Sequence, residues 1–342
     1  MFNRSKKYHY SHALLGILLC SLLAGAATGE PSPDPTYKDC LPGDKAAVLA
    51  INAAFGSYFS KWWGAPETPC CDWYGVECDP FIAGRVTGFF VFKQDDFYGT
   101  IPDAIDGLAH LQRLFLHHLP GLSGPIPPAI GKLSNLSLLI ISWTGLSGPV
   151  PPFLGAPKKL YHLDLSFNSL TGSIPASLGS IPGLSGINVS RNRLYGAVPM
   201  FLSKSADDVY LWLSHNNLTG PVPAEFAAVR FTHLDLSRNA FTGDASGLFG
   251  KGQEDLLYVD LSRNAFDFEL SGLVFPEKLN SVDMSHNAIR GGVPRNMANV
   301  QFFNVSYNRL CGQVPTGASR FGFYSFQHNR CLCGAPLPPC KK

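Results

Sequence analysis

The sequence of 342 residues is poor in charge, because Asp, Glu, Lys and Arg together make up only 15% of it. It also lacks the short motifs that mark common catalytic sites. There is no G-x-S-x-G, no H-E-x-x-H, no P-loop, and no G-x-G-x-x-G that follows a strand and opens a helix. We therefore predict a protein that is not an enzyme and that uses no cofactor and no metal ion.

Long apolar runs are absent after the first 29 residues. The basic residues Arg4, Lys6 and Lys7 precede an apolar run over 13–27 that ends in small residues, a pattern typical of a secretory signal peptide. We predict a signal peptide over 1–29 and a secreted chain with no membrane span, because no later run reaches the roughly 18 apolar residues that a span needs. Three of the 27 basic residues lie in this segment, and the rest number one fewer than the 25 acidic residues. The bulk charge therefore predicts no nucleic-acid partner.

Cysteine is missing from the middle of the chain, between Cys78 and Cys311. Cys20 lies in the predicted signal peptide. The other eight form a group of four near each end: Cys40, Cys70, Cys71, Cys78, Cys311, Cys331, Cys333 and Cys340. An even number in a secreted chain predicts disulfide bonds. Zinc is the alternative, but adjacent cysteines and a single-residue spacing do not match the usual ligand spacing. The residues alone leave the pairing open.

The middle of the chain is a repeat. Units such as LYHLDLSFNSLTGSIP and LSGINVSRNRLYGAVP align on one asparagine, which we call the anchor. The anchors are Asn168, Asn192, Asn216, Asn239, Asn264, Asn287 and Asn308, with spacings of 24, 24, 23, 25, 23 and 21 residues. Three earlier units have Gln94, Leu119 and Thr144 at the anchor position. This period and the pattern L-x-x-L-x-L-x-x-N-x-L are typical of leucine-rich repeats. We predict ten repeats over 86–315.

The pattern has a physical reason at each position. Leu163 and Leu165 alternate on a short strand and point inward, and Asn168 can satisfy buried backbone groups where the strand ends. No repeat buries its own core, so neighbours must stack. We predict an α/β solenoid, a right-handed superhelix with a parallel sheet on its concave side and disulfide-bonded caps over 30–85 and 316–342. In the first cap, residues 44–61 fit an amphipathic helix with Asp44 as its N-cap.

A second motif, G-x-[IV]-P, follows most anchors, as in Gly172-Ser-Ile174-Pro175. With the anchors it resembles the plant-specific extracellular leucine-rich repeat, in which it builds a second short strand. The units that follow Asn239 and Asn264 depart from it, so we expect an irregular outer edge there. The segment Trp62-Trp63 to Cys70-Cys71-Asp72-Trp73 resembles the N-terminal cap of the same plant proteins.

These features cover nearly the whole predicted mature chain, which resembles the polygalacturonase-inhibiting proteins of plant cell walls. The resemblance implies a defence protein of the apoplast that binds fungal, and sometimes insect, endo-polygalacturonases and blocks pectin breakdown. It also implies four disulfide pairs: Cys40–Cys70, Cys71–Cys78, Cys311–Cys331 and Cys333–Cys340.

The repeat pattern also predicts which side chains face outward from the concave sheet. Equal positions on adjacent strands form columns, because parallel strands lie about 4.8 Å apart. The column just before the anchors starts at Phe92-Lys93, where the register is open. It continues with His118, Trp143, Phe167, Arg191, His215, Arg238, Arg263, His286 and Tyr307. The column three positions earlier includes Asp164, Trp212, Asp235, Asp260 and Asp283, and the column between them is mostly serine.

We predict that a partner contacts this face at His118, Trp143, Phe167, Arg191, Trp212, His215, Asp235, Arg238, Asp260, Arg263 and His286. The basic run from Arg191 to His286 would meet acidic groups, and exposed tryptophans are frequent binding anchors. Asp and Ser at these positions also belong to the general repeat consensus, which favours a structural role for them. Paired aspartates on an open sheet lack the closed cleft that glycoside hydrolysis needs.

Histidines are concentrated on the same face. Of ten in the chain, six fall on predicted concave positions: His117, His118, His162, His215, His233 and His286. Histidine gains its charge near pH 6.5 in model peptides, and neighbouring aspartates would raise that value. We hypothesise that the face becomes more positive in an acidic plant wall and then holds an acidic partner more tightly.

Four N-glycosylation sequons lie after the signal peptide, at Asn135, Asn188, Asn217 and Asn304. Asn188 and Asn304 would project from the concave sheet, where a glycan would obstruct docking. We expect at least one of these two to stay unmodified, or a partner to bind around it.

Three other functions use the same fold. The first is a soluble receptor-type module that binds a peptide or protein ligand. The second is a wall protein that holds pectin or polygalacturonate along the run from Arg191 to Arg263. The third is ice binding by a repetitive face, which the irregular aromatic and charged columns disfavour.

Overall fold

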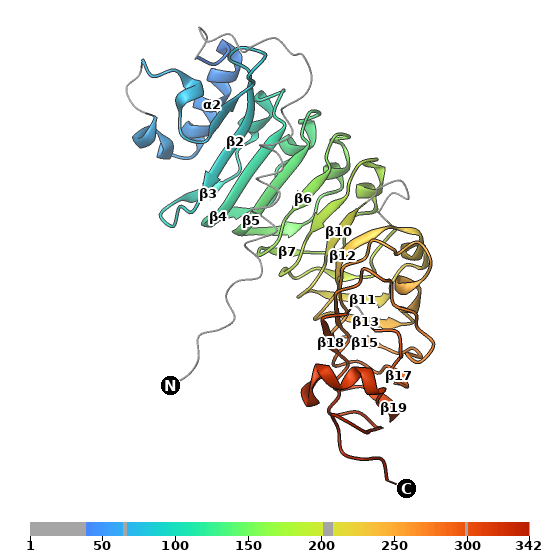
Figure 1. The fold of residues 1–342 in the computed structure, drawn as a ribbon. Coiled ribbons are helices and arrows are strands. Elements are labelled where there is room, and N and C mark those ends of the chain that lie inside the picture. Colours follow the sequence, from blue (N-terminus) through green and yellow to red (C-terminus); the bar gives the residue numbers. More distant parts are fainter. Residues whose placement is uncertain (1–38, 64–66, 201–207, 298–299, 342) are drawn as a thin grey trace.

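The computed structural model describes residues 39–63, 67–200, 208–297 and 300–341. The predicted signal peptide and the first residues of the N-terminal cap lie outside this part. Figure 1 shows a curved stack in which successive coils lie side by side from the N-terminal cap to the C-terminal end. Within the described residues, no helix has the length and apolar character to cross a membrane.

One long sheet lines the concave side and confirms the predicted parallel architecture. Its main path runs in chain order from β1 to β18. The strands are β1 (Val76–Cys78), β2 (Val86–Phe92), β4 (Arg113–Gly124), β5 (Leu138–Pro149), β6 (His162–Asp164), β8 (Gly186–Asn188), β10 (Val209–Trp212), β12 (Phe231–Asp235), β14 (Tyr258–Asp260), β16 (Ser281–Asp283) and β18 (Phe302–Asn304). Only β1 pairs antiparallel on this path. The leucine-type positions beneath the sheet are buried, as Leu163, Leu211 and Val259 show.

A second set of short strands follows the anchors, as the G-x-[IV]-P motif predicts. It comprises β3 (Tyr98–Thr100), β7 (Ser169–Thr171), β9 (Tyr195–Gly196), β11 (Asn217–Pro221), β13 (Ala240–Gly243), β15 (Ala265–Phe266), β17 (Arg290–Gly291), β19 (Arg309–Gln313) and β20 (Cys331–Cys333). The path β9–β11–β13–β15 ends at β15, and β17, β19 and β20 form a separate sheet. This break falls at the repeat that follows Asn264, as expected from its motif. The prediction of an irregular edge after Asn239 is wrong, because β13 pairs with both β11 and β15.

Short 3₁₀ helices complete the coils on the outer side. They are η3 (Asp103–Gly107), η4 (Pro128–Lys132), η5 (Pro152–Gly155), η6 (Ala176–Ser180), η7 (Ala224–Ala228) and η8 (Ser246–Phe249). The first five begin directly after the proline of G-x-[IV]-P: Pro102, Pro127, Pro151, Pro175 and Pro223. Proline holds φ in the extended range that precedes a helix start, so the motif sets where each coil turns.

Each anchor side chain bonds to its own coil and to the preceding one. Asn216 Nδ2 donates to the carbonyls of Val189 and Leu213 at 3.0 Å each, and Asn216 Oδ1 accepts from the backbone N of Leu194 at 3.0 Å. Asn329 makes the same set of bonds in the C-terminal segment. The anchor series therefore continues one position beyond Asn308, into a segment that the sequence analysis treats only as a cap.

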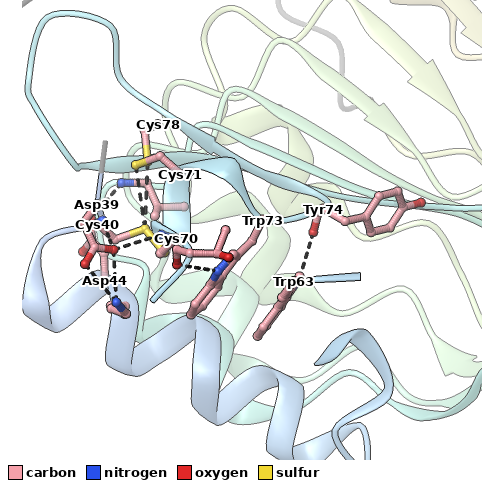
Figure 2. Close-up of a disulfide and its surroundings, with 12 residues drawn as sticks. Asp39, Cys40, Asp44, Trp63, Cys70, Cys71, Trp73, Tyr74 and Cys78 are labelled. Carbon is pink, nitrogen blue, oxygen red and sulfur yellow. Dashed lines mark hydrogen bonds and ion pairs between the residues drawn. A yellow bond between two sulfur atoms is a disulfide. The ribbon is translucent and has the colours of Figure 1, made fainter. Parts of the chain in front are cut away.

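The caps contain the four disulfide pairs that the family resemblance implies: Cys40–Cys70, Cys71–Cys78, Cys311–Cys331 and Cys333–Cys340. Figure 2 shows the first two pairs beside Trp63 and Trp73. The two indole rings stack with centroids 4.4 Å apart. Each indole N–H donates to a backbone carbonyl, so these tryptophans close the open end of the core and do not face a partner.

The predicted helix over 44–61 is wrong at both ends. The helix α2 (Pro42–Ala54) starts two residues earlier, and its start carries no side-chain cap. Asp44 instead accepts a bond from the backbone N of Val86 at 2.8 Å, which ties the helix to β2. Gly56 and Ser57 have φ of 63° and 61°. This left-handed backbone ends the α-helix, and a separate 3₁₀ turn, η1 (Tyr58–Trp62), follows.

Candidate partner-binding face

The column before the anchors has an unusual backbone. Its members from His118 to Tyr307 all have φ between 54° and 58°. Lys93, with φ of 50°, occupies the same place in the first repeat, which settles the open register in favour of Lys93 over Phe92. A left-handed conformation costs a non-glycine residue about 1–2 kcal/mol. Where an asparagine anchor follows, its side chain bonds to the backbone carbonyls just before the turn and stabilises this conformation.

At the N-terminal end of this column the side chains form a stack. Trp143 and Phe167 lie with ring centroids 3.7 Å apart, and the His118 ring stacks on Trp143 at 5.8 Å. The Arg191 guanidinium lies 4.9 Å from the Phe167 ring, a cation–π contact. Trp143 is 45% exposed. An open depression of about 400 Å³ is bordered by Pro120, Trp143, Thr144, Phe167, Asn168 and Arg191.

Further along, the face forms a polar groove of about 330 Å³ between β10 and β18. Its floor carries Asp235, Asp260 and Asp283, which are register partners on adjacent strands. A serine two residues after each aspartate donates its backbone N–H to that carboxylate, at 2.8–3.0 Å. His215, Arg238, Arg263 and His286 border the groove from the column above.

Two carboxylates of the floor, those of Asp235 and Asp260, have raised pKa values. Burial, and after it the charges of Asp235 and Asp283, raises the pKa of Asp260 from 3.8 to about 7. Burial also raises the pKa of Asp235, although hydrogen bonds from Ser237 and Ser214 oppose the shift. Like charges placed directly opposite on adjacent strands repel each other, so the row holds a proton at a pH where an ordinary aspartate is ionised.

From the sequence, neighbouring aspartates are expected to raise the histidine pKa values, and at the following four histidines that expected direction is wrong. Burial lowers the pKa of His162 and His233 to about 4. Burial, followed by the charges of Arg191 and Arg238, lowers the pKa of His215 to about 4. At His286 the influence of Asp283 is outweighed by burial and Arg263, and its pKa is also lowered. Mild acidification therefore makes the face less negative by protonating Asp260, and it does not charge the imidazoles of His162, His215 and His233.

Several concave side chains contact each other and leave little surface for a partner. His162 is 8% exposed, and its ring lies over Gly186, where a Cβ would be 2.1 Å from Nδ1. Phe115, Leu138 and Ile140 form a separate buried cluster. The predicted site residue Trp212 packs between Tyr210 and His233, with centroids 5.8 and 4.9 Å away, and His233 stacks on Tyr258 at 4.1 Å.

The sequence analysis missed one member of the face. His328 has φ of 55° and stacks on Tyr307 at 4.2 Å, and Tyr307 stacks on His286 at 4.1 Å. The signal was present, because His328 precedes Asn329, which follows Asn308 by the same spacing as Asn308 follows Asn287. Because cysteines lie on both sides of His328, this segment was predicted only as a disulfide-bonded cap, although it also contains a repeat.

The four sequons differ in their surroundings. In β8 and β18, Oδ1 of Asn188 and of Asn304 accepts both the backbone N–H and the hydroxyl of the serine two residues on. Asn217 is exposed on β11, in the other sheet. Asn135 lies between repeats, where it bonds to the Ala109 carbonyl and to Lys159.

We predict that glycopeptide mapping of the secreted protein finds a glycan on Asn217 and none on Asn188 or Asn304. Both side chains are already engaged in bonds on the sheet, and Asn304 Nδ2 also donates to Asp283 at 3.1 Å. A glycan there would crowd the side chains of the adjacent strands, which lie about 4.8 Å away. A Thr219→Ala variant, which lacks the Asn217 sequon, should lose the corresponding mass. Full occupancy of Asn188 in folded protein would contradict the prediction.

Comparisons with known proteins agree with this architecture. The model of the leucine-rich repeat N-terminal domain matches residues 41–79, and the leucine-rich repeat model matches 159–181 and 209–228. A polygalacturonase inhibitor of Pyrus communis is 52% identical over 90% of this chain and 94% of its own length. One from Vitis vinifera is 48% identical over 96% and 98%.

A solved structure adds a second kind of relative. The crystal structure of a plant ice-binding protein superposes with a TM-score of 0.83 at 40% identity, and the match covers 88% of this chain and 98% of that one. Identity of this extent to curated inhibitors, together with the repeats and both caps, assigns the family. The chain belongs to the plant polygalacturonase inhibitors, which are built from leucine-rich repeats.

Proposed function

We propose that this protein binds fungal endo-polygalacturonases, and in some cases insect ones, with its concave face and thereby protects pectin in the plant cell wall. The observation that carries the proposal is the column from His118 to His286, whose members share a left-handed backbone. It places an aromatic stack and exposed arginines in one line. The names of the relatives supply the enzyme class.

The proposed mechanism is occlusion without chemistry. Trp143 and Phe167 would provide the desolvated contact that dominates binding energy in most interfaces. Arg191, Arg238 and Arg263 would meet carboxylates of the enzyme and orient it. The face would then lie over or beside the substrate cleft and exclude the pectin chain. We propose that the protein has no enzymatic activity of its own and that it is located in the apoplast.

The test is the release of reducing sugars from polygalacturonate by a panel of fungal endo-polygalacturonases at mildly acidic pH. Purified folded protein should inhibit at least one enzyme in a dose-dependent manner. If the folded protein inhibits no enzyme of the panel, the proposal is wrong. In that case the same preparation should be tested for retention of polygalacturonate and of peptide ligands, the two alternatives that use the same face.

Ice binding is a second candidate, because the solved relative at 40% identity is named an ice-binding protein. The concave columns do not offer a regular flat array, since aromatic, cationic and acidic side chains alternate along them. Thermal hysteresis and ice-recrystallisation assays would decide. Activity in both assays, with no inhibition of any polygalacturonase, would favour this candidate over the first.

A further inference from the structure

Opposite charges occupy two levels in the groove between β10 and β18. Asp235 is 4% exposed, and Asp260 and Asp283 are half-buried, so the carboxylates form the floor. Arg238 and Arg263 are exposed and stand above them. We call these two layers the carboxylate floor and the arginine rim. An approaching molecule therefore meets positive charge first.

The two layers do not neutralise each other by direct pairing. Neither Arg238 nor Arg263 forms an ion pair with another described residue, whereas arginines elsewhere do, as Arg113 does with Glu77 and Arg290 with Asp267. Both arginines are exposed at positions with φ of 54° and 57°, whereas the carboxylate of Asp235 is buried. The rim keeps its hydrogen-bond donors free for a partner.

The charge balance of the groove depends on the floor. Three carboxylates face two guanidinium groups. The imidazoles of His215 and His286 contribute no charge near neutral pH because their pKa values are lowered. The charge of Arg191 also acts on this groove, at Asp235 and His215. Each ionised carboxylate of the floor opposes an acidic partner, and a proton on Asp260 removes one such charge.

Asp260 is the centre of the row. Asp235 and His233 on β12 flank it on one side and Asp283 on β16 on the other, while Tyr258 shares its own strand. From the column above, Arg238, Arg263 and His286 border the same groove. Both carboxylate neighbours favour protonation of Asp260, and burial does so most strongly.

We propose that this groove docks an acidic patch of the partner protein, that the arginine rim receives the partner's carboxylates, and that a proton held on Asp260 strengthens the docking. The partner is the polygalacturonase, so this inference rests on the proposed function. The direction of the pH effect on affinity follows from the charges of the groove. As pH falls from 8 to 6 the floor loses a negative charge, and affinity for an acidic surface rises. A bound acidic surface in turn favours the protonated floor.

The test measures binding, not activity, of an inhibited polygalacturonase at pH 6 and pH 8. Wild-type protein should bind roughly threefold to tenfold more tightly at pH 6, the effect expected of one partly screened charge. Asp260→Asn should bind at pH 8 as wild type does at pH 6, with a flattened pH profile. Arg238→Ala and Arg263→Ala should weaken binding at both pH values.

The chain itself shows that the key variant can fold. Asn188 and Asn304 occupy the same column position as Asp260. Each accepts the backbone N–H of the serine two residues later, as Asp260 does. Asp103→Asn, an exposed residue of η3 away from the groove, makes the same change in net charge and should leave the pH profile unchanged. If Asp260→Asn keeps the wild-type pH slope, or if acidification weakens binding, the inference is wrong.

A short poly-L-glutamate peptide tests the docking chemistry of the groove separately from the proposed function. Binding of this probe should follow the same pH dependence and need Arg238 and Arg263. If no polygalacturonase binds but the probe behaves as stated, the docking chemistry stands and the proposed function fails. If a polygalacturonase binds and neither Asp260→Asn nor Arg263→Ala changes its affinity, the proposed function stands and this inference falls.

Discussion

Replacing Asn216 by alanine is expected to lower the free energy of unfolding by about 3 kcal/mol, as chemical denaturation would show. The side chain is 8% exposed. It joins Val189, Leu194 and Leu213, so its loss leaves donors and acceptors unpaired at the interface between its own coil and the preceding one. In a repeat protein, stability resides largely in such interfaces, and a break in the centre would reduce the cooperativity of unfolding as well.

The matched control is Asn280→Ala, which removes the same side chain from an exposed position before β16. Surface substitutions of this kind change stability by less than about 0.5 kcal/mol. Equal effects of the two variants would mean that the anchor bonds are not what holds the coils together.

Replacing Trp143 by alanine is expected to weaken inhibition at least about tenfold, a typical effect for a central tryptophan in an interface. The indole is 45% exposed in the free protein, and its face rests on Phe167 at 3.7 Å. It is therefore rigid before the partner arrives, and little side-chain entropy is lost on binding. Inhibition constants from reducing-sugar assays give the measurement.

Tyr195 provides the control, because it is 57% exposed but lies on β9 in the second sheet. Tyr195→Ala should leave the inhibition constant unchanged. Trp143→Phe should retain part of the affinity, since a phenylalanine can still stack on Phe167. A Trp143→Ala variant with full inhibition and a wild-type melting temperature would move the interface to another part of the concave sheet.

Much of this molecule was predictable because a leucine-rich repeat ties each position to one physical role. The period of the leucines predicted the inward face, and the anchors predicted where each strand ends. The columns followed from strand spacing, so His118, Trp143, Phe167 and Arg191 could be placed in one line without coordinates. The structure adds that they stack, which depends on the left-handed backbone at each position.

Electrostatics could not be predicted in the same way. The sequence placed His215 and Asp235 on the same concave face, and aspartates there were expected to raise the histidine pKa values. In the fold, burial and the two flanking arginines act more strongly and lower it. The pKa of Asp260 shifts upward because the residue is buried and, after that, because the register sets Asp235 and Asp283 opposite it. Burial and register are properties of the assembled sheet, and no single repeat contains them.

Local breaks in the pattern were also hidden. Nothing in the spacing of Val48, Ile51 and Phe55 reveals that the cap helix ends before Gly56. The cysteine-rich C-terminus concealed the repeat that carries His328 and Asn329. Gly186 reads as one more small residue in a strand, yet its missing side chain is what allows His162 to lie across the sheet.

The most direct test of the account compares Arg191→Glu with Arg193→Glu in one inhibition assay. These residues are exposed and lie on either side of the anchor Asn192, so the same charge reversal is made on the concave column and just beyond it. The account predicts that Arg191→Glu loses inhibition at least about tenfold, while Arg193→Glu inhibits as wild type does. Equal inhibition by the two variants, both folded, would contradict a partner-binding role for the concave face.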